Sequence, residues 1–349
     1  MANRYLFLLG SFLALLHSHL QPAAAAELIS SAAIAPKRAR VVIVQDAQAT
    51  SAFNPQPDII RELVRRGLIH LTGQTTLETA WRSLVSTQDL VGIKVFSSPG
   101  ATSGTRPAVV TAVVQGLLSA GLPPRQILIW DKHLADLRLA GFFELAEKYG
   151  AHVAGSAEEG YDEAAYYETA LLGRLVWGDT EFGKKGEGVG RRSFVSNLVT
   201  RKMTKIINVT PLLNHNLAGV SGNLFGLSLG SVDNVLRFEM DPERLGTAVP
   251  EIYALPALGD RVVLNIVDAL ICQYEGEERG LLHYSTPLNQ LRFSTDPVAL
   301  DVLSLQELVR QRHATNAPLE KACLEIYQNA SLLQIGVSQP QNIKVEMAP

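Results

Sequence analysis

Short apolar runs and helix-like stripes alternate along most of the chain. Runs rich in β-branched residues predict buried strands at 40–46, 89–96, 125–131, 204–211 and 261–270. Apolar residues at helical spacing predict helices at 57–67, 76–85, 105–122, 141–150, 296–312 and 318–329, and a short strand follows at 342–347. Helices between strands join parallel strands. We therefore expect an α/β fold, with a mainly parallel sheet and helices on both faces.

One stretch breaks this alternation. Residues 155–192 are rich in glycine, tyrosine and acidic residues, and include EFGKKGEGVGRR at 181–192. We expect an irregular insertion or a hairpin there. The rest of the pattern is that of an α/β fold, and the length allows one large or two modest domains.

The first 26 residues have the pattern of a secretory signal peptide. Arg4 precedes an apolar run at 5–16, and Ala23–Ala26 offers a cleavage site before Glu27. The alternative is a membrane anchor, but the run is shorter than the roughly 20 residues that a spanning helix needs. We expect a periplasmic or secreted protein with no stable membrane span after cleavage.

Composition narrows the classes of partner. Hydrophobic residues make up 47% of the 349 residues and charged residues 19%, as in globular proteins. The 31 basic and 34 acidic residues give a net charge of −3, so there is no basic excess for binding nucleic acid. We expect no nucleic-acid partner.

The two cysteines, Cys272 and Cys323, belong to no CxxC motif. The sequence therefore predicts no iron–sulfur cluster and no zinc finger. In an oxidising compartment the two thiols can pair, and the alternative is two buried free thiols.

Polar residues gather where the predicted strands end. Ligands of open parallel sheets bind beyond the carboxyl ends of the strands, so these residues are candidates for one site. They are Asp46, Lys94, Asp131, Lys132, His133, Asn214, His215, Asn216 and Asp268. Lys94 lies in an otherwise apolar strand, where a buried ammonium needs a partner. It is either an anion or carbonyl contact, or an edge lysine whose stem snorkels.

The loop SSPGATSGT at 97–105 opens a helix, and helix N termini favour anions. Ser103 and Thr105 are therefore candidate ligand-binding residues, together with His133 and Asn223. The alternative is an ordinary capped loop in which Thr105 is the cap.

His215, between two asparagines, is a candidate acid–base group or metal ligand, with Asp268 as a second ligand to a divalent ion. The alternative is a turn histidine satisfied by the backbone. The spacing of Gly219, Gly222, Gly226 and Gly230 predicts one smooth helix face, for packing or for the approach of a ligand. No HExxH or GxSxG motif occurs, which argues against zinc hydrolases and serine hydrolases.

Two aspartates lie near the start of the helix at 296–312. Asp296 before Pro297 has the pattern of an N-cap. Asp301 lies on or beside the apolar stripe, so its carboxylate needs a partner: Lys94, Arg292, a metal ion or a substrate. We expect Asp301 and Lys94 to act with His215 in catalysis.

Four motifs together carry a family resemblance. They are VGIKVFSSPGATSGTRPAVVTAVVQGLLSAGLPPRQILIWD, NHNLAGVSGNLFGLSLG, LNIVDAL and STDPVALD. Over about 38–345 the chain resembles domain-of-unknown-function family 362 (DUF362), whose general activity is not established. Two lysines common in the family are Leu213 and Gly222 here, so no anion contact by those lysines is implied. Residues 104–133 also resemble, locally, the nickel-pincer lactate racemases, which implies isomerisation of a hydroxy acid.

Together these features predict an exported small-molecule enzyme with a polar site at the carboxyl ends of the strands, metal-assisted if a divalent ion is bound. We expect the ligand to be a small anion. The alternative is a non-catalytic periplasmic protein that binds a small anion, and a further alternative is a structural role.

Overall fold

A nine-stranded mixed sheet organises the computed structural model, which describes residues 38–169, 190–317 and 324–349. The strand order is β13-β1-β12-β11-β9-β4-β5-β6, with β10 paired to β9. The strands are β1 (Ala39–Gln45), β4 (Val91–Val95), β5 (Ile127–Asp131), β6 (His152–Gly155), β9 (Lys205–His215), β10 (Gly219–Val220), β11 (Val262–Gln273), β12 (Ser285–Ser294) and β13 (Ile343–Met347). The strands β11, β9, β4, β5 and β6 are mutually parallel, which confirms the expected α/β class.

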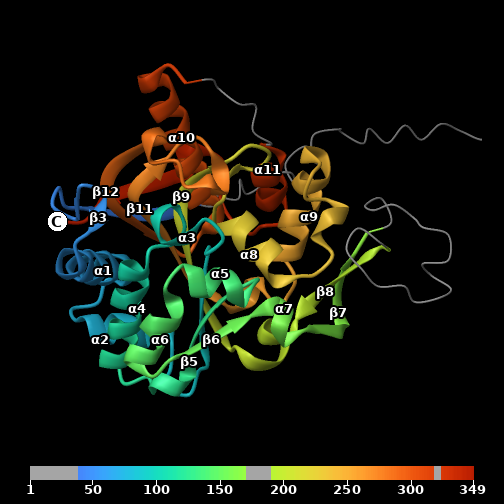
Figure 1. Ribbon diagram of the computed structural model, residues 1–349, viewed down its shortest axis with the longest axis horizontal. Coiled ribbons are helices and arrows are strands. Elements are labelled where there is room, and N and C mark those ends of the chain that lie inside the picture. Colours follow the sequence, from blue (N-terminus) through green and yellow to red (C-terminus); the bar gives the residue numbers. More distant parts are fainter. Residues whose placement is uncertain (1–37, 170–189, 318–323) are drawn as a thin grey trace, which may run out of the picture. The chain divides into compact units, whose positions relative to one another are not determined.

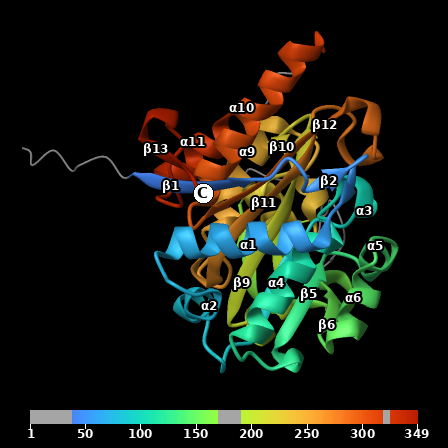
Figure 2. The same ribbon diagram turned by 90° about the vertical axis from the view of Figure 1, so that its left-hand side faces the viewer.

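Helices cover both faces of the sheet, each with its own apolar core (Figures 1 and 2). Figure 2 looks onto the face covered by α1 (Pro57–Thr72), α2 (Leu77–Leu84), α4 (Pro107–Ser119) and α6 (Phe142–Tyr149). The other face carries α8 (Asn223–Ser231), α9 (Pro242–Tyr253), α10 (Pro297–Thr315) and α11 (Glu325–Leu332). None of the helices within the described ranges is long and apolar enough to cross a membrane.

Shorter elements surround these layers. They are β2 (Thr50–Ser51), β3 (Asn54–Pro55), α3 (Gly100–Ser103), α5 (Leu134–Leu139), α7 (Ser156–Glu159), β7 (Tyr161–Glu168) and β8 (Arg192–Ser196). In the segment expected to be an insertion or hairpin, β7 and β8 pair as a separate antiparallel ribbon. The proposed signal peptide, part of this segment and Cys323 lie outside the described residues, and Cys272 has a free, buried thiol.

Two helix boundaries differ from the sequence prediction. The first helix continues past Gly67 and ends at Gly73, which adopts the left-handed conformation. Gly67 is needed inside the helix because a Cβ there would lie 2.3 Å from a ring carbon of Phe293. Thr105 is not the cap of α4, because its hydroxyl donates to the carbonyl of Val209 at 2.7 Å and accepts from the amide of Phe96 at 2.9 Å.

Several elements were not predicted from the sequence, among them β6, α5, β12 and α9, and the last two carry local signals against their conformation. The strand β12 is antiparallel to both β11 and β1, and its sequence STPLNQLRFS contains a proline and a left-handed Asn289 instead of an alternating pattern. The helix α9 contains Pro250, a residue that normally ends a helix. Tertiary packing against the neighbouring elements overrides both local signals.

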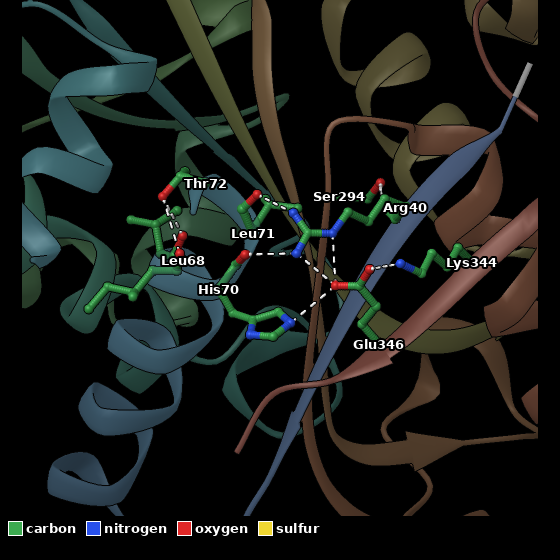
Figure 3. A network of polar contacts seen from close by, with 9 residues as sticks. Arg40, Leu68, His70, Leu71, Thr72, Ser294, Lys344 and Glu346 are labelled. Carbon is green, nitrogen blue, oxygen red and sulfur yellow. Dashed lines mark hydrogen bonds and ion pairs between the residues drawn. The ribbon is translucent and has the colours of Figure 1, made fainter. Parts of the chain in front are cut away.

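A network of charged groups fastens the last strand to the first helix (Figure 3). The Arg40 guanidinium on β1 donates to the carbonyls of His70 and Leu71 at the end of α1, at 2.9 and 2.7 Å. It also binds Glu346 on β13 at 2.7 Å, and Lys344 binds the other carboxylate oxygen at 2.8 Å. These two cations lower the pKa of Glu346 to about 2.

The helix α8 lies close against the sheet through its glycines. A Cβ at Gly226 would lie 3.4 Å from Phe96, and one at Gly230 would lie 2.5 Å from Cε of Lys94. A Cβ at Gly222, just before the helix, would lie 2.2 Å from a carboxylate oxygen of Asp301. The glycines were expected either to allow close packing or to let a ligand approach the backbone. The structure shows close packing.

We expect Gly222→Ala to lower the free energy of unfolding by about 2 kcal/mol, because the new methyl group displaces a fully buried carboxylate. Gly226→Ala is the matched control. Its methyl group makes an ordinary contact, and replacing a helical glycine stabilises by up to ~1 kcal/mol. Urea denaturation of the two variants measures the difference. Equal effects would contradict this account of the glycine face.

Candidate functional site

A row of buried polar side chains crosses the sheet beneath α8. Lys94, Asn208, Asn265 and Ser294 are successive register partners on β4, β9, β11 and β12, so they share one face. Lys94 is 1% exposed, and its ammonium forms an ion pair with Asp131 at 2.8 Å. It also donates to the carbonyl of Val95 at 2.7 Å. Lys94 is therefore a buried, paired lysine and not a snorkelling one.

Two consecutive serines after β4 join carboxylates from two other segments. Ser97 donates to Asp131 at the end of β5 through both its amide and its hydroxyl, each at 2.7 Å. The hydroxyl of Ser98 donates to Glu278 at 2.5 Å. Glu278 lies in the turn η5 (Glu277–Arg279), in the loop between β11 and β12. A chain of contacts therefore runs from Lys94 inside the sheet to the exposed side chain of Glu278.

The loop that carries Glu278 is fastened on both sides. Gln273 at the end of β11 accepts from Ser103 at 2.6 Å and donates to the carbonyl of Glu277 at 2.9 Å. The Glu277 amide donates to the Asn214 side chain at 3.0 Å, and the Glu277 carboxylate accepts from the amide of Asn216 at 2.7 Å. Glu277 has a φ of 50°, a left-handed conformation that is uncommon outside glycine. Such strain persists only where surrounding contacts hold it.

Two carboxyl groups at this edge have raised pKa values. The pKa of Glu278 is raised because nearby protein atoms partly desolvate its carboxylate, although the residue as a whole is exposed. Repulsion from Asp131, Glu239 and Asp136 adds to this effect, while the Ser98 hydrogen bond opposes it. The pKa of Asp136 on α5 is raised by burial and by the charge of Asp131. Carboxyl groups poised in this way are common in functional sites. We call the five residues Asp131, Asp136, Glu239, Glu278 and His133 the acidic edge.

Asp268, expected as a metal ligand, forms a fully buried ion pair with Arg106 at 3.0 Å. Its second oxygen accepts from the Arg106 amide, also at 3.0 Å, at the N terminus of α4. Across the described ranges, no three His, Cys, Asp or Glu side chains are grouped so as to hold a metal ion. Because Asp268 already neutralises an internal cation, this arrangement gives no support to the expected metal site of His215 and Asp268, which stays a prediction.

Asp301 does not pair with Lys94 or Arg292. Its carboxylate accepts from the amides of Asn223 and Leu224 at 2.7 and 2.9 Å, and from the Asn223 side chain at 2.8 Å. It thus occupies the N terminus of α8, where unpaired amides favour a negative charge. Asn223, expected to bind a ligand, is fully buried in the same contact.

His215 lies at the end of β9 and faces Phe225, with ring centroids 4.2 Å apart. Its Nδ1 accepts from the amides of Leu217 and Ala218 at 3.2 and 3.0 Å. Burial lowers the pKa of the imidazole, which favours the neutral ring with its proton on Nε2. Two interpretations of His215 were open. The structure shows the second of them, a turn histidine whose ring accepts hydrogen bonds from backbone amides. No contact between described residues joins His215 to Asp268 or Asp301.

His133 is exposed, and its electrostatic interaction lowers the pKa of the neighbouring Asp136. Of the expected site residues, Asp131 and His133 therefore belong to the acidic edge, and Lys94 pairs with Asp131. Ser103, Asn214 and Asn216 hold the loop that carries Glu278. The sequence reasoning missed Ser97, Asp136, Glu239 and Glu278. Ser97 stands in the loop already singled out, but Asp136 and Glu278 follow no predicted strand closely enough to be chosen.

Comparisons with known proteins establish the family. The pattern described as "Domain of unknown function (DUF362)" matches residues 91–306. The chain belongs to this family. No curated protein matches the sequence.

A solved structure of a Thermotoga maritima protein is similar at 12% identity with a TM-score of 0.38. The similarity covers 80% of this chain and 59% of that one. The expected likeness of residues 104–133 to nickel-pincer lactate racemases is not supported by these findings.

The buried carboxyl of Asp301 makes a specific prediction about pH. Burial raises its pKa from 3.8 to about 6, although three N–H donors oppose the shift. Because the folded protein then binds the proton more tightly than the unfolded chain, this contribution to stability is full below pH 4 and is lost as the pH rises through about 6.

We therefore expect the stability advantage of the unmodified protein over Asp301→Asn to shrink between pH 4 and pH 7, by up to about 3 kcal/mol. Urea denaturation at four pH values measures this, with the exposed Asp260→Asn measured alongside as the control. An advantage that widens with pH would show that the hydrogen bonds to the carboxylate outweigh its burial.

Proposed function

We propose that the protein is an exported small-molecule enzyme whose site is the acidic edge, with Glu278 as the acid–base group. The observation that carries the proposal is the pair of consecutive serines that joins Asp131 and Glu278. It brings two carboxylates from separate segments to the carboxyl ends of parallel strands, where ligands of such sheets bind.

The roles differ with the surroundings of each carboxylate. Asp131 is buried and bonded to Lys94 and Ser97, so it serves to position its neighbours. Glu278 is exposed and accepts a hydrogen bond from Ser98, while its raised pKa favours keeping a proton. An accessible carboxyl group with a pKa nearer neutrality can give and take a proton during a reaction.

The charge of this edge favours a cationic ligand. Four carboxyl groups, from Asp131, Asp136, Glu239 and Glu278, repel one another there, while Lys94 is already paired. The helix N termini considered as anion sites hold the chain's own carboxylates, Asp268 at α4 and Asp301 at α8. In this proposal a small amine therefore replaces the anion expected from the sequence.

Two matched probes test the site: butane-1,4-diamine and succinate, which have the same carbon number and opposite charge. We expect millimolar diamine, and not succinate, to raise the melting temperature. Glu278→Gln should remove most of this shift, whereas the exposed Glu144→Gln on α6 should keep it. The shift should grow with pH, because Glu278 attracts a cation only when ionised. Stabilisation by succinate alone would support a small-anion binding protein instead.

Export is tested by the N terminus of the mature protein. We expect the protein expressed with its full sequence in a bacterium to be recovered from the periplasm or medium, beginning at Glu27. Edman sequencing or intact-mass measurement reads this directly. Replacing Ala24 and Ala26 by Gln should leave the uncleaved form in the membrane fraction. A cytoplasmic protein that begins at Met1 would refute export.

A further inference from the structure

The strand β13 is the last strand of the sheet, and among the described residues one of its edges has no strand partner. The other edge pairs in parallel with β1, with Met347 opposite Ile43. The amide of Ala348 donates to the carbonyl of Ile43 at 2.9 Å. Because backbone groups alternate between the two edges of a strand, the N–H and C=O of Ile343, Val345 and Met347 point away from β1. Three residues thus present donors and acceptors at this free edge.

The side chains of β13 repeat symmetrically about its centre. The strand reads Ile343-Lys344-Val345-Glu346-Met347, with an apolar residue at each end and in the middle and opposite charges between them. Val345 is 45% exposed and Met347 57% exposed. Lys344 is also largely exposed, and its contact with Glu346 lies on the opposite face of the strand from Val345. A strand with this order is complementary to itself when it is turned by 180°.

We propose that β13 pairs antiparallel with β13 of a second copy of the chain, about a two-fold axis at Val345. Val345 would face the partner's Val345, and Ile343 would face the partner's Met347. Lys344 would lie opposite the partner's Glu346, so that each interface holds two opposite-charge cross-strand pairs on one face and apolar pairs on the other. The arrangement is isologous, as two-fold dimers require.

Charge selects this register over its neighbours. A shift of two residues would place Lys344 opposite the partner's Lys344, or Glu346 opposite the partner's Glu346, and like charges directly opposite each other are destabilising. A shift of one residue would exchange the apolar and charged faces. Parallel pairing in register would also set like charges side by side. The only arrangement that matches backbone groups, apolar residues and charges together is the one centred on Val345.

Sedimentation equilibrium of the full chain tests the interface. We expect a dimer at micromolar concentration. Val345→Pro removes the outward-pointing N–H and none of the bonds to β1, so it should raise the dissociation constant about 10-fold or more while leaving the fold intact. Val345→Thr keeps both the N–H and the β-branched shape and is the matched control. A monomer at every concentration, or a dimer that is unaffected by Val345→Pro, would overturn the proposal.

Two further variants test charge and register without changing the backbone. Lys344→Glu should also raise the dissociation constant, because it sets two carboxylates opposite each other. Val345→Cys should form a cross-linked dimer on oxidation, since hydrogen-bonded antiparallel partners have Cα atoms about 5.5 Å apart, within disulfide range. Lys344→Cys should not, because its two copies would be offset along the strands. Equal cross-linking of the two cysteine variants would exclude the register and with it the proposed interface.

Discussion

The contact between the Asp301 carboxylate and the first amides of α8 fixes the arrangement on which the site depends. This contact sets where α8 begins, and the glycine at 222 leaves room for it. The helix then crosses the sheet with Gly230 directly over Lys94. A side chain at that position would push the lysine away from Asp131. The ion pair of Lys94 and Asp131 holds Ser97, and the next residue, Ser98, binds Glu278. Both contacts therefore depend on the Asp301 carboxylate, which lies on α10.

The same device recurs at other helices. Asp268 lies at the N terminus of α4, and Asp296 caps α10 by accepting from the amide of Ala299 at 2.9 Å, as its sequence pattern predicted. In each case a carboxylate from elsewhere in the chain or from the residue before the helix satisfies amides that would otherwise be free. These helix ends are therefore not open to an external anion. At the carboxyl ends of the strands, Asp136 and Glu278 have pKa values raised in part by neighbouring acidic groups.

The sequence predicted four of the five parallel strands, β4, β5, β9 and β11, because apolar runs are a local signal; it missed the short β6. It also led correctly to the ends of the strands as the polar region. It could not assign partners: Asp268 and Lys94 look equally available in the sequence, yet one pairs with Arg106 and the other with Asp131. Partner choice is set by register between strands far apart in sequence. The antiparallel β12 was missed for a related reason, since its residues gain their strand conformation from two neighbours.

The two proposed sites lie apart. The acidic edge is at the carboxyl ends of the strands near β4 and β5, and the proposed dimer contact is along the outermost strand, β13. Both proposals can therefore hold together. The strands β4 and β5, which carry Lys94 and Asp131, are separated from β13 by β1, β12, β11 and β9. A partner that extends the sheet at β13 would therefore leave the acidic edge open to a ligand. It would also reinforce the contact between Arg40 and Glu346, because the strand that carries Glu346 would then be held on both sides. Pairing at one end of the sheet can thus stabilise the fold without closing the site at the other.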